Sequence, residues 1–373
     1  MIKRKFRKVK RVKELIPDSI TEKALTLNPL MSPEQPATSE PVPRITNENI
    51  TEHREEVLKG ARKYIYPLQH SKKRIVSVTL TLAAAAALTF LVYCSLALYH
   101  FYQYNIFLYR VTQVVPFPIA KADGNYVSYE NYLFELRHYI HYYQSQQQLD
   151  FASSGKQQLY RFRQQALSNV LDQAYTKIIA RQNGVGVSGR EIDSRIAEVR
   201  NQNRLGTNNK VFADVLRDYW GWSINDFKRS LKQEILSEKV AAKLDTQTNQ
   251  RAQSALTQLK SGTDFATLAK TASDDPAAPT TGGDFGFAIT KSNPNVSPEL
   301  IDAMFKLKPG EISGIVLASP VISGAPPSLQ IVKVTQNDGK TVSALHIVFN
   351  LKPTSTYVNA LKTKKPPHLY VKF

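Results

Sequence analysis

One uncharged stretch divides this chain. Ile75 to Leu98 is a run of 24 residues without a formal charge. At about 1.5 Å per residue, a helix of that length crosses a hydrocarbon core of about 30 Å. A cleaved signal peptide is the competing interpretation, but this run is too long for one and starts some seventy residues into the chain. We therefore predict a retained transmembrane signal anchor over residues 73–100.

The residues beside this stretch predict its orientation. His70-Ser71-Lys72-Lys73-Arg74 precedes it, and the next Lys or Arg is Arg110. The residues in between form an aromatic run typical of a membrane interface: Tyr99, Phe101, Tyr102, Tyr104, Phe107 and Tyr109. Because Lys and Arg remain on the cytoplasmic side, we predict a single-pass cell-membrane protein whose N-terminus is cytoplasmic and whose later domains are extracytoplasmic.

The segment before the span, residues 1–72, starts with a basic run and has many prolines between Pro17 and Pro43. It holds too few large apolar residues to offset the entropy lost on ordering, so we predict a disordered basic cytoplasmic head. Its first residues could touch nucleic acid or anionic lipid. A charge run that sets topology explains them more simply, and no nucleic-acid partner is expected.

Charge and cysteine content restrict what the distal part can be. The chain has 49 Lys and Arg against 31 Asp and Glu, a formal net charge of +18. We attribute this excess to a solvated surface, with an anionic envelope or acidic clients as the alternative. The single cysteine, Cys94, lies in the span. The distal part is therefore expected to lack disulfides, thiol nucleophiles and Cys-based metal sites.

Helical patterns fill residues 123–247, after a stiff linker predicted at 101–122. Ser128 is placed to cap the first helix, and two later helices open with capping-box spacing, at Ser188 and Ser223. Apolar residues recur with helical spacing in between. We predict an all-helical domain here.

Two histidines lie one turn apart in the first of these helices. His138 and His141 could share a metal in principle. No third ligand is evident nearby, and tyrosines are interleaved with them. Aromatic packing is therefore the prediction, and no metal or other cofactor is expected.

The pattern changes in residues 248–373. Two short helices, the glycine-rich Gly282 to Phe287 and a further helix come first, and strand patterns follow at Ile312 to Leu317, Leu329 to Thr335 and Val342 to Phe349. Helices followed by strands at hairpin spacing predict an α+β domain with an antiparallel sheet. The alternating run His368 to Phe373 is predicted to be one more strand, which closes an edge of the sheet.

Residues 250 to 335 resemble the parvulin-type (PpiC) peptidyl-prolyl isomerase domain. The resemblance is carried by AQSALTQLKSGTDFATLAKTASDD, GGDFGF, SPELIDAMFKLKPGEISGIV and LQIVKV, in the order of the family. The preceding part, with DGNYVSYENYLFELRHYIHYY and QALSNVLDQAYTKIIARQNGVGVSGREI, is similar to the helical amino-terminal domain of SurA- and PrsA-like foldases. Together they imply a membrane-anchored chaperone and peptidyl-prolyl cis-trans isomerase, a rotamase, that acts on unfolded or newly exported proteins with X-Pro bonds.

The resemblance also implies where a proline would bind. It places the apolar slot for the proline ring at Phe285, Val296 and Leu300. It also places Phe305 there. The alternative is that all four residues are simply part of the core, and for Phe305 this is the interpretation that we favour. The flanking glycines make Phe285 the strongest slot residue, because they permit backbone angles and close approaches that other residues resist.

The polar position that is Cys or Asp in the family falls on Asp275, with Asp274 as the alternative. An ordinary turn before a proline would also explain these two residues. The histidine of the family's last strand is replaced by Gln330. A glutamine amide donates and accepts hydrogen bonds but carries no proton charge. A mechanism that needs an imidazole there is thereby excluded, although support by hydrogen bonds is kept.

The family's opening strand, of the form Ala-x-His-Ile-Leu-Val, does not precede Asn249. A matching string, Ala344-Leu345-His346-Ile347-Val348-Phe349, comes after the last family strand instead. We predict a circularly permuted sheet in which Val342 to Phe349 takes the missing place and brings His346 beside Gln330 and Asp275. A second, truncated isomerase domain is the rival explanation, but only 24 residues follow Phe349.

These departures leave two functions open. The chain is predicted to catalyse prolyl isomerisation through Asp275, Gln330 and His346, with activity that can be weak. The alternative is a non-catalytic membrane-anchored chaperone or scaffold that keeps a degenerate parvulin domain as a binding surface.

Overall fold

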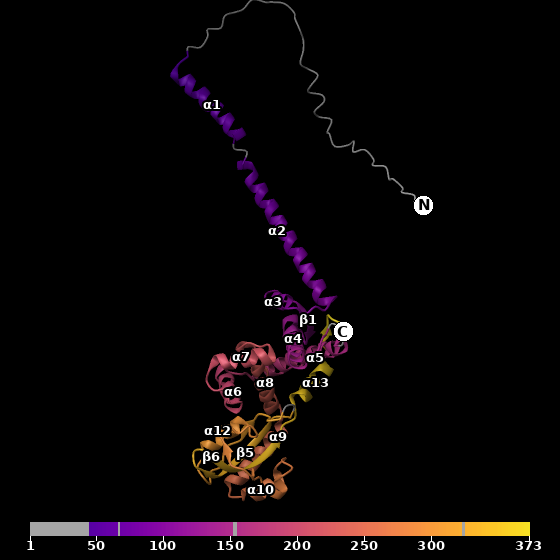
Figure 1. The fold of residues 1–373 in the computed structure, drawn as a ribbon, viewed down its shortest axis with the longest axis vertical. Coiled ribbons are helices and arrows are strands. Elements are labelled where there is room, and N and C mark those ends of the chain that lie inside the picture. Colours follow the sequence, from indigo (N-terminus) through magenta and orange to yellow (C-terminus); the bar gives the residue numbers. More distant parts are fainter. Residues whose placement is uncertain (1–44, 66–67, 152–154, 323–324) are drawn as a thin grey trace, which may run out of the picture. The chain divides into compact units, whose positions relative to one another are not determined.

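The computed structural model describes residues 45–65, 68–151, 155–322 and 325–373 (Figure 1). Two units divide the chain, Met1–Ala83 and Ala84–Phe373. The helices are α1 (Asn47–Ile65), α2 (Leu68–Tyr99), α3 (Ile106–Val114), α4 (Tyr129–Gln147), α5 (Lys156–Gln182), α6 (Gly189–Gln202), α7 (Asn209–Trp220), α8 (Ile224–Leu244), α9 (Thr246–Lys260), α10 (Phe265–Ala272), α11 (Ala278–Thr281), α12 (Pro298–Phe305) and α13 (Thr354–Lys364). The strands are β1 (Pro118–Ala122), β2 (Asn125–Ser128), β3 (Ile289–Thr290), β4 (Val316–Ala318), β5 (Ser328–Asn337), β6 (Thr341–Asn350) and β7 (His368–Leu369).

Helix α1 lies inside the head that we predicted to be disordered, and the structure differs there. Its sequence, NENITEHREEVLKGARKYI, has no proline and is rich in good helix formers. Glu48 in the first turn complements the helix dipole. Residues 1–44 and 66–67 of the head lie outside the part of the chain that the structure describes.

Helix α2 contains the predicted span. An 18-residue window in its segment Arg74–Tyr99 has a mean hydropathy of 2.3, and the segment is long and apolar enough to cross a membrane by length and composition. The last turns of α2 belong to the folded second unit, however. Cys94, Ala97 and Leu98 are buried in its core, and the hydroxyl of Tyr129 donates to the carbonyl of Leu98 at 2.6 Å. The free apolar part of α2 is therefore shorter than predicted.

The predicted linker, residues 101–122, is also folded into the second unit. It forms α3 and β1, with Leu108 and Ile119 completely buried. The aromatic run before and within it was expected at a membrane interface, but four of its tyrosines pack against this core: Tyr99, Tyr102, Tyr104 and Tyr109. Only Phe101 and Phe107 of that run are largely exposed. The structure therefore gives the tyrosines a packing role in this core, and the aromatic belt stays a prediction.

A first core holds together what we call the helical module, residues 94–244 and 354–373. The core is made by α4, α5 and the second half of α8, beside the three-stranded sheet β2-β1-β7. The final helix and strand return to it, because Val358 and Val371 are buried there. The hydroxyl of Tyr175 also donates to the carbonyl of Lys365 at 2.5 Å.

This return differs from the predicted domain plan, which assigned all of 248–373 to the parvulin-like domain. The strand expected at His368 exists, but β7 pairs with β1 of the helical module. It does not close the sheet that carries β5 and β6.

The sheet module, residues 246–352, is α+β as predicted. Its antiparallel sheet has the order β3-β6-β5-β4. One face packs on α9 and α10 through residues such as Ile331 and Phe349, and the other packs on α12 through residues such as Val332 and Val334. In Figure 1 the strands β5 and β6 accordingly lie between α10 and α12.

Strand β6 is a central strand of this sheet. It pairs antiparallel with β5 on one side and with β3 on the other, and Val332 is opposite His346. The predicted position of Val342 to Phe349 beside Leu329 to Thr335 is therefore confirmed. This is the arrangement that the permutation hypothesis required.

Candidate active site

His346 lies on the face of β6 that also carries Val342 and Ala344. Gln330 is on the same face of β5, diagonally across the strand pair, since Val332 is opposite His346 and Gln330 is opposite Val348. Diagonal neighbours on a sheet are within reach of long side chains. The His346 Nδ1 atom accordingly lies 3.2 Å from the Gln330 Oε1 atom.

Asp275 reaches the same histidine from a loop. The backbone N–H of Asp274 donates to the Val348 carbonyl at 2.7 Å, and the hydroxyl of Ser273 accepts from the Val348 N–H at 3.0 Å. These bonds attach the loop to β6. They bring the Asp275 Oδ2 atom to 3.1 Å from the His346 Nε2 atom, so the three polar residues predicted from the sequence meet at one point.

Asp274, the alternative, has a structural task. Its carboxylate accepts two hydrogen bonds from Arg251, at 2.6 and 3.1 Å, and one from the Asn350 N–H at 2.9 Å. Burial alone would raise the pKa of Asp274, but these hydrogen bonds and the Arg251 charge lower it. It is therefore a carboxylate that fixes the loop, while Asp275 faces the histidine.

The glycine-rich loop covers the remaining side of His346. The carbonyl of Gly283 accepts from the His346 N–H at 2.7 Å, and the Phe285 N–H donates to the Ala344 carbonyl at 3.3 Å. The Phe285 ring then lies against the imidazole, with 4.0 Å between the ring centroids. The site is a mostly covered imidazole, 14% exposed, between an aromatic ring and a carboxylate that is 21% exposed.

Burial lowers the pKa of His346 below its ordinary value of 6.5, and the charge of Asp275 opposes this only in part. A neutral imidazole has one N–H, yet both of its ring nitrogens face oxygen atoms here. Half a turn of the Gln330 amide would present an N–H to Nδ1 and leave the N–H of Nε2 to donate to Asp275. Glutamine can therefore serve as the hydrogen-bond partner of His346 in both of its protonation states.

The lowered pKa predicts how stability depends on pH. The unfolded chain binds a proton at His346 near pH 6.5, whereas the folded chain binds it only at lower pH. The stability that His346 contributes is thus present above pH 6.5 and is lost as the pH falls through the folded pKa. The wild type should exceed His346→Gln in free energy of unfolding by more at pH 7.5 than at pH 5, as measured by denaturant titration. A constant difference would contradict the assignment.

The predicted slot residues do not all lie open. Val296 and Leu300 are each only 2% exposed and belong to the core beneath α12. Phe285 packs against this core but is partly exposed, and Phe305 is partly exposed beneath the Lys291 ammonium. Phe285 is thus the one of the three slot residues that offers surface beside His346. A substrate-binding role for Phe285, Val296 and Leu300 stays a prediction.

Two positioning residues escaped the sequence reasoning. Ser273 holds the Asp275 loop on β6, and Ser328 accepts a hydrogen bond from the Gln330 amide at 2.9 Å. Ser328 could have been found, because it stands two residues before Gln330 on the same strand and so shares its face. Ser273 gave no such signal, since its partner is a backbone N–H far along the chain.

Of the histidine pair of the helical module, His138 lies in aromatic packing, as predicted. The His138 ring stacks on Trp222 with 4.4 Å between centroids and lies 5.0 Å from Trp220. The His141 Nε2 atom is 3.3 Å from the Asp218 carbonyl oxygen.

Family models match part of each module. Residues 69–241 match the family model described as the SurA-like N-terminal domain, and residues 228–321 match the PPIC-type PPIASE domain. The chain is thus similar to a SurA-like N-terminal domain followed by a PPIC-type PPIASE domain. The PPIC-type match ends before β5 and β6, so Gln330 and His346 lie beyond it.

Individual relatives match smaller parts. The Chaperone SurA of Yersinia pestis and that of Yersinia pseudotuberculosis are each 42% identical over 77 residues, which is 20% of this chain and 17% of the relative. The chain thus spans about a sixth of the length of these curated relatives. The foldase protein PrsA of Streptococcus pneumoniae is 21% identical, covers 54% of this chain and 75% of its own, and superposes with a TM-score of 0.18, too low to bear on the fold.

Proposed function

We propose that this chain is a membrane-anchored peptidyl-prolyl cis-trans isomerase and chaperone for proteins exported across the membrane. The observation that carries the proposal is the meeting of His346, Asp275 and Gln330 beside the exposed edge of Phe285. The PPIC-type and SurA-like matches support it.

Prolyl isomerisation requires no covalent bond between the enzyme and the substrate. It requires groups that are correctly positioned around the X-Pro amide. An X-Pro amide isomerises slowly because rotation disrupts its resonance, with a barrier of about 18 to 20 kcal/mol. An enzyme speeds it by binding the twisted amide better than the planar one. Phe285 offers an apolar surface for the proline ring, and the buried imidazole with its carboxylate offers polar groups at fixed positions.

An exchange or protease-coupled assay on an X-Pro peptide, with the full chain in detergent micelles, tests this proposal. We expect the wild type to accelerate isomerisation. His346→Ala together with Asp275→Ala should lower kcat/KM at least about tenfold, because each carries groups that are preorganised for the twisted state.

His368→Ala is the matched control, since this histidine is exposed on β7, and it should leave the rate unchanged. No acceleration by the wild type, or a double variant as fast as the wild type, would defeat the catalytic assignment.

A second function is favoured by one observation. Val296 and Leu300 are almost completely buried, which leaves little of the expected slot open. A non-catalytic chaperone or scaffold would keep the sheet module as a binding surface. Suppression of aggregation of an unfolded client, without acceleration of the X-Pro peptide, is the result that identifies this alternative.

Placement outside the membrane belongs to the same proposal. The apolar part of α2 and the basic residues before it fit a single-pass anchor with a cytoplasmic N-terminus. Accessibility of the sheet module to protease added outside intact cells checks this orientation, and protection from that protease would reverse it.

A further inference from the structure

A cavity of about 580 Å³ lies between the helical and the sheet modules. Helices α6, α7 and α8 supply one wall, and loops next to α12 and β4 supply the other. Phe212 and Leu216 form the apolar floor, while Tyr219 and Val321 at the cavity are 52% and 46% exposed. This size is within the range of about 300 to 1,000 Å³ of ligand sites.

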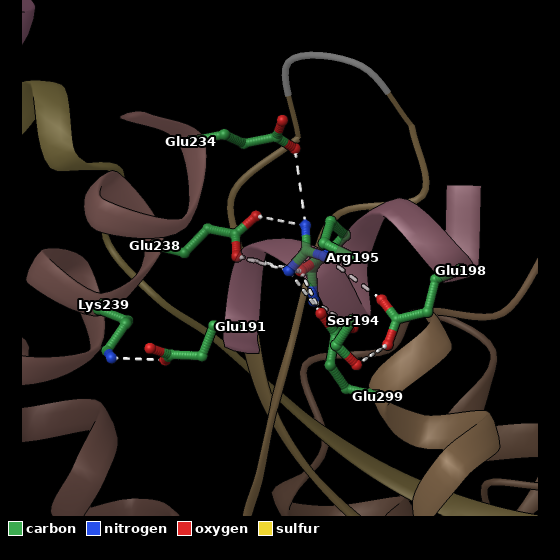
Figure 2. A network of polar contacts seen from close by, with 9 residues as sticks. Glu191, Ser194, Arg195, Glu198, Glu234, Glu238, Lys239 and Glu299 are labelled. Carbon is green, nitrogen blue, oxygen red and sulfur yellow. Dashed lines mark hydrogen bonds and ion pairs between the residues drawn. The ribbon is translucent and has the colours of Figure 1, made fainter. Parts of the chain in front are cut away.

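Two residues that line this cavity, Arg195 and Glu234, belong to a cluster of charged side chains next to it. Figure 2 shows Arg195 surrounded by Glu198, Glu234, Glu238 and Glu299. The distances from the guanidinium nitrogens to these four carboxylates are 3.5, 3.8, 3.1 and 2.5 Å, in that order. Arg195 also donates to the hydroxyl of Ser319. One guanidinium thus faces four carboxylates, a local excess of three negative charges.

The charge of this cluster is opposite to that of the chain as a whole, which has a formal net charge of +18. Glu234 lines the cavity itself, has its Arg195 contact at the longest of the four distances, and is half exposed, with 52% of its side chain accessible. Burial and the neighbouring charge of Glu238 raise the pKa of Glu234. A cation that arrived from outside would relieve this repulsion, because opposite charges at contact favour the ionised form.

We propose that this inter-module cavity is a peptide-binding site for unfolded segments that carry a large apolar side chain next to a lysine or arginine. The apolar side chain enters between α7 and Val321, and the cation pairs with Glu234. The inference rests on the proposed function, since it names the class of client segment. It adds a site that is separate from His346.

The test uses the full chain in detergent micelles and three fluorescein-labelled 12-residue peptides. Each peptide has two phenylalanines and no proline, and the residues beside them are lysine, serine or glutamate. Fluorescence anisotropy should give the lysine peptide a dissociation constant several-fold below that of the serine peptide, with the glutamate peptide weakest. Glu234→Gln should weaken the lysine peptide by about threefold to fivefold, as for a partly exposed ion pair, and leave the serine peptide unchanged.

Two further variants locate the effect. Asp193→Asn removes an exposed carboxylate that pairs with Lys228 on the same two helices, and it should leave the order of the three peptides as in the wild type. Tyr219→Ala should weaken all three peptides alike, because it removes apolar surface. Equal thermal unfolding of each variant and the wild type excludes misfolding as the cause.

The possible outcomes separate the two proposals. Equal binding of the lysine and glutamate peptides, or equal losses for Glu234→Gln and Asp193→Asn, would overturn the cavity assignment even if the X-Pro peptide is isomerised. Absence of isomerisation with lysine-selective, Glu234-dependent binding would overturn only the catalytic proposal. If Glu234→Gln instead turned an oligomer into a monomer in sedimentation, the occupant would be a second copy of the chain, and the client assignment would fail.

Discussion

Gly283→Ala is expected to lower the free energy of unfolding by about 3 kcal/mol and to abolish isomerase activity. Gly283 has φ = +84°, and a Cβ added there would lie 2.3 Å from the His346 carbonyl oxygen and 3.1 Å from the Ala269 Cβ. The first of these atoms is backbone, so it cannot move aside as a flexible side chain would. The loop must retreat from β6, which takes Phe285 away from the imidazole.

Gly310→Ala is the control for this prediction. Gly310 has a similar φ of +88°, but an added Cβ would have no heavy atom within 4 Å. It therefore incurs only the conformational cost of a left-handed alanine, about 1 kcal/mol. Denaturant unfolding of both variants, with the X-Pro assay, separates the backbone cost from the clash. Equal losses for the two variants would mean that the loop does not press on β6 as described.

Arg195→Met should also lower the free energy of unfolding, by about 3 kcal/mol. The Arg195 side chain is 12% exposed and that of Glu238 is 8% exposed, so removing the guanidinium leaves buried carboxylates without a counter-charge. The loss should be smaller at pH 5 than at pH 7.5. Burial and nearby carboxylates already raise the pKa of Glu198 and Glu234, and their protonation removes the charges that Arg195 balances.

Arg217→Met provides the matched comparison. Arg217 is 64% exposed and pairs with Asp214 and Asp218 on the surface, so its loss should change the stability far less, because solvent screens exposed ion pairs. Urea titration of both variants at the two pH values is the measurement. Arg195 pairs with Glu238 of the helical module and with Glu299 of the sheet module. If Arg195→Met lowered the free energy of unfolding no more than Arg217→Met does, these ion pairs would not hold the two modules together.

The pairing of β5 with β6 and the meeting of the three polar side chains could be predicted, because both depend on a short sequence motif. The string from Ala344 to Phe349 alternates like a strand and matches the family's first strand, so its place beside β5 could be inferred. Once that pairing is assumed, the diagonal between Gln330 and His346 follows from the geometry of a sheet. A loop of ordinary length is then enough to bring the Asp275 carboxylate to His346.

Other features were out of reach because they depend on which neighbour covers an apolar residue. Val296 and Leu300 are apolar, but the sequence does not reveal whether a substrate proline or the core of the protein occupies the space beside them. The tyrosines after α2 suit a lipid interface and a protein core equally well. Val371 returns to the core that contains Ile119, although the two residues are some 250 positions apart in the sequence. No local sequence pattern reveals such a contact.

The placement of α13 and β7 has a consequence for biosynthesis. A ribosome delivers the chain from its amino terminus, and the sheet module is one continuous segment whose entrance and exit meet where the Lys352 N–H donates to the Asp245 carboxylate at 2.9 Å. That module can close while the helical module still lacks residues 354–373. A nascent chain paused at this stage would present a finished sheet beside a module whose Tyr132 has yet to be covered by Phe373, so the helical module, which is synthesised first, is completed last.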